Sequence, residues 1–352
     1  MIALGLDDLE AGMTLAKDVN NHMGVVELAE GTVLTNRIID KLKYRNIAEI
    51  YVEDSALTRQ KDFLAKYQHQ LFITESIFQE TAETGSVPIK SAEQFVKGSL
   101  QPMLRQSGTI DFLYQARGNN PYEYQHAMNV SILSGVLAKW LHYDENSTAE
   151  IMLAGLLHDI GKTKLPPELL AKNSSKRSAR EKVLYENHSK LGYELLKYNP
   201  NVSENVRLSI LEHHEHTDCS GYPGRLLSDR IHPYAKIIAI MNKYDGITAS
   251  AESSTQTPFA ALDAITQKMF STLDTKACIA LIHNLKTSLI GSEVVLSDNS
   301  KGKIAYYAQE NYKAAPLISL YESNKVLDLN QRSDLKIIAY NPAKEANTAL
   351  LA

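Results

Sequence analysis

Apolar residues recur at spacings of three and four between about residues 90 and 290. This period is typical of helices with one buried face, so the stretch predicts a large helical core. Short alternating runs dominate residues 1–58 and residues 291–352 instead. We therefore expect a mainly α protein with a small N-terminal α/β domain and a small C-terminal β subdomain.

The first 58 residues predict the small α/β domain. Residues 24–35 alternate like a strand, a turn and a second strand. Asn36 stands where it could cap a helix over 37–45, and residues 47–53 predict another strand. Polar residues at helical spacing follow and predict connecting helices.

The last 60 or so residues predict strands. Residues 293–308 form two short runs around an Asp-Asn-Ser turn, which is typical of a hairpin. Further apolar runs at 316–323, 325–330 and 335–340 predict three more strands. These runs indicate a small β-rich subdomain.

Length and charge narrow the class of protein. A chain of 352 residues is long enough for two or three domains. Its formal net charge of −4 argues against binding of a nucleic acid polymer, which needs a basic face. No window approaches the ~18 apolar residues of a membrane span, and the start lacks a signal-peptide pattern. The expected location is the cytoplasm.

Five of the eleven histidines fall on apolar helical faces near predicted helix ends. They are His126, His158, His188, His213 and His214. Asp159 follows His158 directly, and Gly161 is expected to end that helix. The stripe expected to carry His188 also holds Leu184, Leu191 and Leu195. Asn242 shares a face of a later helix with Ile238 and Asp245.

A single histidine on an apolar face is usually a satisfied core residue, and this alternative applies to each of the five. Burying all of them without a cation would leave ring nitrogens unpaired at roughly 1–3 kcal/mol each. The two cysteines, Cys219 and Cys278, form no zinc-knuckle pattern. Neutral imidazole with carboxylate suits iron, manganese or zinc. A metal site is therefore expected.

Five histidines and an aspartate are too many for one catalytic metal that keeps an open position. Two metals ~3.5–4 Å apart, bridged by Asp159 and a hydroxide, could deliver that hydroxide in line to a phosphorus atom. The predicted reaction is phosphoester hydrolysis.

These motifs resemble the HD-GYP family, within the HD superfamily of metal-dependent phosphohydrolases. LLHDIGK at 156–162 resembles the HD signature, and HHEHTDCSGYPGRL at 213–226 resembles the family's HHE and Gly-Tyr-Pro stretch. The resemblance covers about residues 110–290 and implies an HD-type helical bundle core. The expected domains are 1–58, a helical linker 59–110, the HD-GYP domain 111–290 and the C-terminal subdomain 291–352.

The resemblance implies a cyclic di-GMP phosphodiesterase that forms the linear dinucleotide pGpG, GMP or both, while some members of the family take related cyclic dinucleotides. It implies two divalent metals, iron or manganese first, with zinc or nickel as alternatives. The implied metal ligands are His126, His158, Asp159, His188, His213, His214 and Asn242, with Asp159 bridging.

The resemblance also implies residues that act on the substrate. Lys162 would lie near the reacting phosphate, although a lysine at a helix C-terminus is the plainer alternative. Tyr222 would contact a guanine or phosphate, with packing as its alternative, and Gly221 and Pro223 would fix the loop.

The sequence departs from the family's pattern at several positions. Asn242 stands where the family has a metal-binding aspartate, and Tyr122 where members with a third metal have a glutamate. Cys219 replaces a loop glycine and so restricts positive φ there. Residues 249–258 lack the arginines that grip the phosphates of the dinucleotide.

Other basic residues could replace the missing phosphate contacts, and several functional hypotheses stay open. The substitutes are Arg225 and the charged segment 172–180, for which a solvated loop is the alternative. Besides a phosphodiesterase, the chain could be a catalytically degenerate domain that binds a cyclic dinucleotide or a signalling protein. Hydrolysis of another phosphoester and redox use of a di-iron pair are further alternatives, and the oligomeric state stays open.

Overall fold

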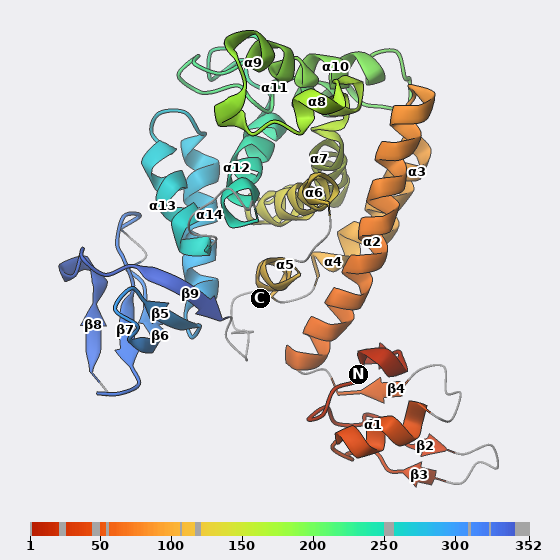
Figure 1. Ribbon diagram of the computed structural model, residues 1–352, viewed down its shortest axis with the longest axis vertical. Helices are drawn as coiled ribbons and strands as arrows, with labels where there is room; N and C mark the ends of the chain where they lie inside the picture. Colours follow the sequence, from red (N-terminus) through yellow and green to blue (C-terminus); the bar gives the residue numbers. More distant parts are fainter. Residues whose placement is uncertain are drawn as a thin grey trace. The chain divides into compact units, whose positions relative to one another are not determined.

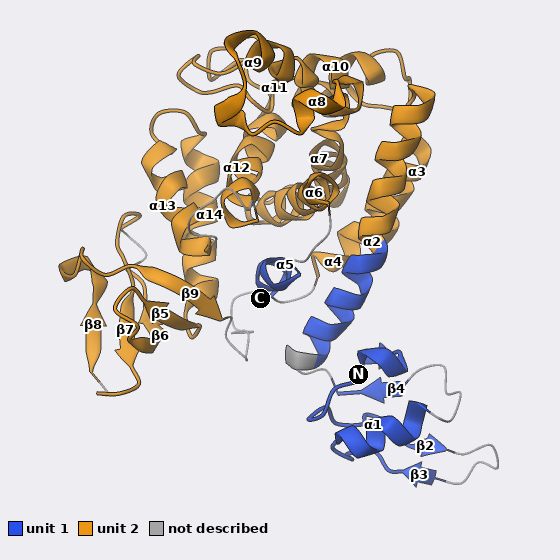
Figure 2. Cartoon of the chain, viewed as in Figure 1, with its two compact units in different colours: residues 1–69, 106–116, 344–352 blue, residues 70–105, 117–343 orange. Residues whose placement is uncertain are grey.

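The computed structural model describes residues 2–20, 26–43, 50–53, 56–105, 108–116, 121–249, 257–308, 311–323 and 325–341. The chain divides into two compact units (Figure 2). The first runs to residue 69 and takes in 106–116, and the second comprises 70–105 and 117–343. The helix α2, Ala56–Thr84, contributes to both. The domain boundaries expected at 58, 110 and 290 stay a prediction.

The first unit is a small α/β structure with its own apolar core (Figure 1). Its elements are β1 Ile2–Leu4, the 3-10 helix η1 Leu6–Asp8, β2 Val19–Asn20, β3 Val26–Leu28, α1 Asn36–Lys43, β4 Ile50–Val52 and α5 Thr109–Gln115. The antiparallel pairs β1–β4 and β2–β3 form its two small sheets. Leu15, Leu34 and Val52 are almost fully buried in the core of this unit.

Two predictions in this unit are wrong in detail. The expected hairpin at 24–35 does not form, because β3 pairs with the upstream strand β2, and Val33 makes only an isolated bridge with Thr14. The residues around Val33 hydrogen-bond instead to the buried segment around Met13. The α1 cap is Thr35, whose Oγ1 accepts the Ile38 N–H at 3.3 Å, one residue earlier than expected. Residues 24, 25 and 44–49 lie outside the described residues.

The second unit contains the large helical core expected from the apolar spacing. Its helices after α2 are α3 Ile89–Phe95, the π-helical turn η2 Val96–Leu100, α4 Gln101–Met103, α6 Tyr122–Trp140, α7 Glu145–Leu157, η3 Ile160–Lys164, α8 Pro167–Leu170, η4 Ser174–Lys176, α9 Ala179–Glu186, α10 His188–Leu196, α11 Glu204–Glu212, α12 Pro233–Thr248, α13 Pro258–Lys268 and α14 Thr275–Leu289. No helix among the described residues is long and apolar enough to cross a membrane.

Helices α6 and α7 form an antiparallel pair at the centre of this core. A Cβ on Gly155 of α7 would lie 3.0 Å from the Cα of Ser131, so the two backbones approach closely there. The Ser131 hydroxyl donates to the Met152 carbonyl at 2.7 Å and joins the helices. Because a short connection links α6 to α7, the start of α6 lies beside the end of α7, where the HD motif follows.

The C-terminal strands form one antiparallel sheet of order β8-β7-β6-β5-β9. They are β5 Glu293–Leu296, β6 Lys301–Tyr306, β7 Leu317–Leu320, β8 Val326–Asp328 and β9 Ile337–Asn341, and the 3-10 helix η5 Leu329–Gln331 follows β8. The expected hairpin turn is present, with Asn299 at φ 69° and the Asp298 carboxylate accepting the Ser300 N–H. The mainly α fold class with small β regions at both ends is confirmed.

Candidate metal centre

The HD motif lies where α7 ends. Helix α7 stops at Leu157, so His158 and Asp159 follow it directly and Gly161 lies in η3 rather than ending the helix. The ring of His158 lies 5.2 Å from that of His126, near the start of α6. The pairing of α6 with α7 therefore brings together residues 32 positions apart.

Two glycines let α10 approach the HD motif. A Cβ on Gly161 would overlap the His188 carbonyl oxygen and lie 2.5 Å from the Gly192 nitrogen. A Cβ on Gly192 would in turn lie 2.8 Å from a methyl group of Ile210 in α11. Only residues without a side chain allow this approach. The contact delivers His188 from α10 to the motif.

Three of the histidines share one arrangement at helix ends. His158 and His213 follow α7 and α11, and His188 comes two residues after α9. The ring Nδ1 of each lies 2.7 Å from the carbonyl oxygen three residues earlier, that of Gly155, Tyr185 or Ile210. A carbonyl only accepts, so Nδ1 carries the proton and Nε2 keeps its lone pair. The same hydrogen bond satisfies one of the last carbonyls of each helix and fixes the tautomer.

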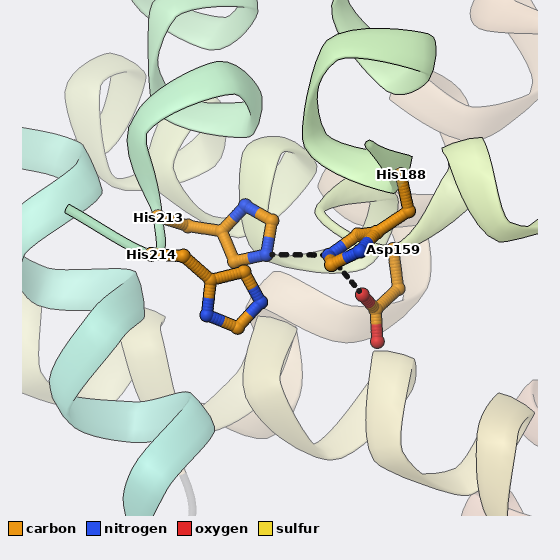
Figure 3. Close-up of side chains that lie close together, drawn as sticks. All are labelled: Asp159, His188, His213 and His214. Carbon is orange, nitrogen blue, oxygen red and sulfur yellow. Dashed lines mark hydrogen bonds and ion pairs between the residues drawn. The ribbon is translucent and has the colours of Figure 1, made fainter. Parts of the chain in front are cut away.

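The Nε2 atoms converge on the Asp159 carboxylate. His188 Nε2 lies 3.2 Å from Oδ1 and His158 Nε2 lies 3.3 Å from Oδ2. The Nε2 atoms of His188 and His213 are 3.3 Å apart, and Figure 3 shows these rings and the carboxylate turned toward one another. With both Nδ1 atoms protonated, lone pairs face lone pairs, and only a cation satisfies such an arrangement.

The donor set fits divalent metal. His126, His158 and Asp159 form one group whose ligand atoms lie within 4.8 Å of one another, and Asp159, His188, His213 and His214 form a second. Asp159 belongs to both groups. Its Oδ1 and the Nε2 of His158 are buried and have no hydrogen-bond partner among the described residues, because the short Asp159–His188 contact lacks hydrogen-bond geometry. Buried acceptors without a donor of this kind fit the binding of a cation.

The charges of the site agree with this fit. Burial lowers the pKa of His188 to about 4, although the Asp159 carboxylate opposes that shift. Burial likewise holds the pKa of both His213 and His214 well below its usual range. Burial penalises the Asp159 carboxylate too, but the Lys162 ammonium, 2.5 Å from Oδ2, and His158 hold its pKa well below its usual range. Neutral imidazoles and one carboxylate are ligands that divalent first-row metals accept.

Asp245 in α12 is a residue of the site that the sequence analysis did not assign. Its Oδ2 lies 2.7 Å from His126 Nδ1 and its Oδ1 accepts the Asn129 amide at 2.8 Å. The carboxylate therefore turns His126 Nε2 toward Asp159, 4.0 Å away. A carboxylate behind a ligating histidine is the usual outer partner of a metal ligand. The sequence places Asp245 on the same helix face as Asn242, and this shared face could have identified it as a residue of the site.

Asn242 itself is part-buried in α12, one turn before Asp245, and its amide forms no hydrogen bond with a described residue. Its role as a ligand stays a prediction. Tyr122 stacks on the His126 ring at 5.3 Å, so no carboxylate occupies that position. The stripe expected for His188 is wrong, because the chain breaks at Asn187 and Leu184 is 43% exposed.

Glu215 holds the Gly-Tyr-Pro loop and is a second residue that the sequence analysis missed. Its buried carboxylate accepts three consecutive backbone N–H groups, those of Gly224, Arg225 and Leu226. A Cβ on Gly221 would overlap the His214 carbonyl oxygen, which accepts the Tyr222 N–H at 3.1 Å. The loop is thus fixed to the backbone of the histidine pair itself. The spacing between HHEH and Gly-Tyr-Pro reflects this contact.

Within the loop, the Tyr222–Pro223 peptide is cis, and the Tyr222 ring stacks on His214 at 4.5 Å. Burial raises the pKa of the Tyr222 phenol, so its hydroxyl stays protonated. Cys219 adopts φ 64°, the left-handed conformation that the glycine-like position demands. Arg225 also has positive φ, and its side chain is exposed.

Lys162 lies at the edge of the cluster. It belongs to η3, and its side chain is 19% exposed. Burial disfavours its charged form, but the Asp159 carboxylate outweighs burial and raises the pKa of Lys162. Its ammonium lies 5.2 Å from the centre of the Tyr185 ring. Lys162 therefore pairs with Asp159 and also lies in the last turn of η3, and its role toward a substrate stays a prediction.

The fold and the site define a helical domain with a cluster of histidines around a shared aspartate that could hold metal ions. Residues 115–276 match the family model described as an HD domain. The cyclic di-GMP phosphodiesterase PA4108 of Pseudomonas aeruginosa is 31% identical over 174 residues, which are 49% of this chain and 42% of that protein. The cyclic di-GMP phosphodiesterase PdeB of Borreliella burgdorferi is 24% identical over 62% of this chain and 57% of its own length.

Among solved structures, Bd1817, a HDG"Y"P protein from Bdellovibrio bacteriovorus, aligns with a TM-score of 0.52 at 16% identity and covers 81% of this chain and 99% of its own. The chain spans about half the length of the two curated relatives. The helical core of its second unit contains the HD domain that the family model matches, and the similarity to these phosphodiesterases and to Bd1817 supports membership of the HD-GYP family.

Proposed function

We propose that this chain is a metal-dependent phosphodiesterase that hydrolyses cyclic di-GMP to pGpG, GMP or both. The observation that carries the proposal is the convergence of the His158 and His188 Nε2 atoms on Asp159, with the His213 Nε2 3.3 Å from that of His188. Each of these three histidines has its Nδ1 committed to a carbonyl. The names of two relatives, both cyclic di-GMP phosphodiesterases, support the substrate.

The proposed cofactor is a pair of divalent cations, iron or manganese first. His126 and His158 would hold one and His188, His213 and His214 the other, with Asp159 shared between them. Bound there, such a pair activates water and stabilises the charge that develops on a phosphoryl group.

The chain's own residues would prepare the site for an anionic substrate. Asp245 and the three helix-end carbonyls fix the direction in which the imidazoles point. Burial, by lowering their pKa values, keeps His188, His213 and His214 neutral. Lys162 adds a positive charge beside Asp159, where charge on a departing oxygen could be neutralised. Tyr222 offers a ring face and a protonated hydroxyl to a guanine or a phosphate.

A turnover assay with metal-loaded protein tests the proposal. The protein is loaded with Fe(II) or Mn(II), incubated with cyclic di-GMP, and its products are separated by chromatography. We expect pGpG or GMP with the wild type and a loss of at least a hundredfold with Asp159→Asn, because the shared ligand loses its charge. Metal-loaded wild type that leaves cyclic di-GMP intact would refute the proposal.

The degenerate-domain alternative rests on Asn242, a neutral amide where the family has a carboxylate. A weaker ligand there would loosen one metal. The Asn242→Asp variant separates the two hypotheses, because it should retain metal more tightly and turn over faster if this side chain faces the site. Binding of cyclic di-GMP by wild type, with turnover in neither protein, would favour the alternative.

A further inference from the structure

Arg177 has an unusual environment for a guanidinium group. It is part-buried in the connection before α9, and its Cζ lies 3.7 Å from the centre of the Tyr185 ring. Its Nε is buried and has no hydrogen-bond partner among the described residues, and no carboxylate among them forms an ion pair with it. A guanidinium held in place by an aromatic ring and without an internal carboxylate can pair with an anion from outside the chain.

The conformation of the chain fixes where Arg177 lies. Ser178 caps α9 through a capping box with Glu181, and Lys172 pairs with the same glutamate at 2.5 Å. Both ends of the short segment are thereby held, although the segment is a solvated loop in which only Arg177 is part-buried. Its neighbours Lys176 and Arg180 are exposed. Of the three cations in residues 176–180, Arg177 is therefore the one that is part-buried.

The Tyr185 ring connects Arg177 to the metal centre. The ring lies 5.3 Å from that of His188, and its backbone carbonyl accepts the His188 Nδ1–H. The Lys162 ammonium is 5.2 Å and the Arg177 Cζ 3.7 Å from the same ring centre, so these two cations are at most about 9 Å apart. Both cations therefore contact one aromatic ring next to His188.

A cyclic dinucleotide differs from a simple phosphodiester by its second phosphate, which lies across the ring from the one under attack. A guanidinium binds a phosphate with two parallel N–H donors, and stacking on an aromatic ring holds its plane in place. The basic positions expected after α12 are absent from the sequence of residues 249–258, of which 250–256 lie outside the described residues.

We propose that Arg177, held flat on Tyr185, binds the phosphate of a cyclic dinucleotide that is not under attack and so selects two-phosphate substrates over one-phosphate substrates. This inference rests on the proposed function of the metal centre. Arg177 is a binding residue in this proposal, and the bond cleavage depends on the metal ligands.

Selectivity measured on the full-length metal-loaded protein tests the inference. The value of kcat/KM is measured for cyclic di-GMP and for bis(p-nitrophenyl) phosphate, which has one phosphate. In Arg177→Met the ratio of the two values should fall by about 10- to 100-fold, the range for losing a hydrogen-bonded charge pair. Arg180→Met, an exposed arginine three residues on, should keep the wild-type ratio. Metal content and circular dichroism of both variants establish that the site and fold are intact.

Direct binding separates this inference from the proposed function. Calorimetry with cyclic di-GMP should give a dissociation constant about 10- to 100-fold higher for Arg177→Met than for wild type. If the wild type binds the dinucleotide but hydrolyses neither substrate, the proposed function fails while the ratio of dissociation constants still decides the role of Arg177. A wild-type dissociation constant in Arg177→Met, or an equal loss of both activities, would overturn the inference.

Discussion

Acid should destabilise the metal-free protein over a defined range of pH because of its buried histidines. Burial lowers the pKa of His188 from 6.5 in the unfolded chain to about 4 in the folded one. Between these values the unfolded chain binds a proton that the folded chain does not. Stability therefore falls as pH decreases from 6.5 toward 4, by about 1.2 kcal/mol per pH unit for this one ring. At pH 4.5 the loss amounts to about 2.5 kcal/mol.

The titratable groups around His188 also change the stability of the folded chain with pH. His213 and His214 shift in the same direction and steepen the slope. Asp159, whose pKa is lowered, contributes stability that is lost only below the pH at which free carboxyls titrate. Glu212 acts with the opposite sign, because burial raises its pKa. A difference between two proteins that share these groups isolates the contribution of His188.

Urea unfolding of metal-free wild type and His188→Gln, followed by circular dichroism at pH 7, 6, 5 and 4.5, measures that difference. The wild-type curve should be steeper by about 1.2 kcal/mol per pH unit between pH 6 and 4.5. Parallel curves for the two proteins would contradict the reasoning, because they would mean that the ring is as easily protonated in the folded chain as in the unfolded one.

Three further substitutions test the architecture around the cluster. Asp245→Asn should weaken metal retention against a chelator by about 10- to 100-fold, whereas Asp144→Asn at the exposed α7 cap should not change it. Gly161→Ala should lower the unfolding free energy by about 3 kcal/mol, since its methyl group would overlap the α10 backbone, while Gly98→Ala in open space should raise it by about 0.5–1 kcal/mol. Cys219→Gly should stabilise the fold by about 1 kcal/mol by relieving a left-handed residue, and Cys219→Ala should not. Melting curves without metal check the last two, and a stabilised Gly161→Ala or a destabilised Cys219→Gly would be contrary results.

The helical core and the C-terminal strands were predictable because their signal is periodic and local. Each apolar run after residue 290 became one strand of the sheet, and the turn residues of the hairpin lie where the sequence places them. The N-terminal pairing was not predictable from local pattern. There β3 pairs with β2, and the residues that follow β3 bond to the buried segment around Met13 and Leu15 rather than folding back on β3.

Residue type identified the candidate ligands, but it could not identify what orients them. His158, His188 and His213 stood out because several histidines in one core need a common explanation. Asp245 and Glu215 did not, because an acidic residue in a helix or loop is usually solvated, and only the tertiary contacts with His126 and with the Gly-Tyr-Pro loop distinguish them. Arg177 likewise could not be identified from the sequence alone, since its stacking on Tyr185 depends on how α9 meets the segment before it.

The helix ends also set the charge preference of the site. Helices α7, α9 and α11 all end at the cluster, and each helix C-terminus carries a partial negative charge of about half an electron. Three such ends and the ionised Asp159 attract cations and repel a phosphate. An anionic substrate is therefore favoured only after metal has bound, with Lys162 and the proposed contact from Arg177 adding positive charge at the edge. Binding of cyclic di-GMP should accordingly weaken when the metal is removed, and a dissociation constant that is the same with and without metal would contradict this electrostatic account.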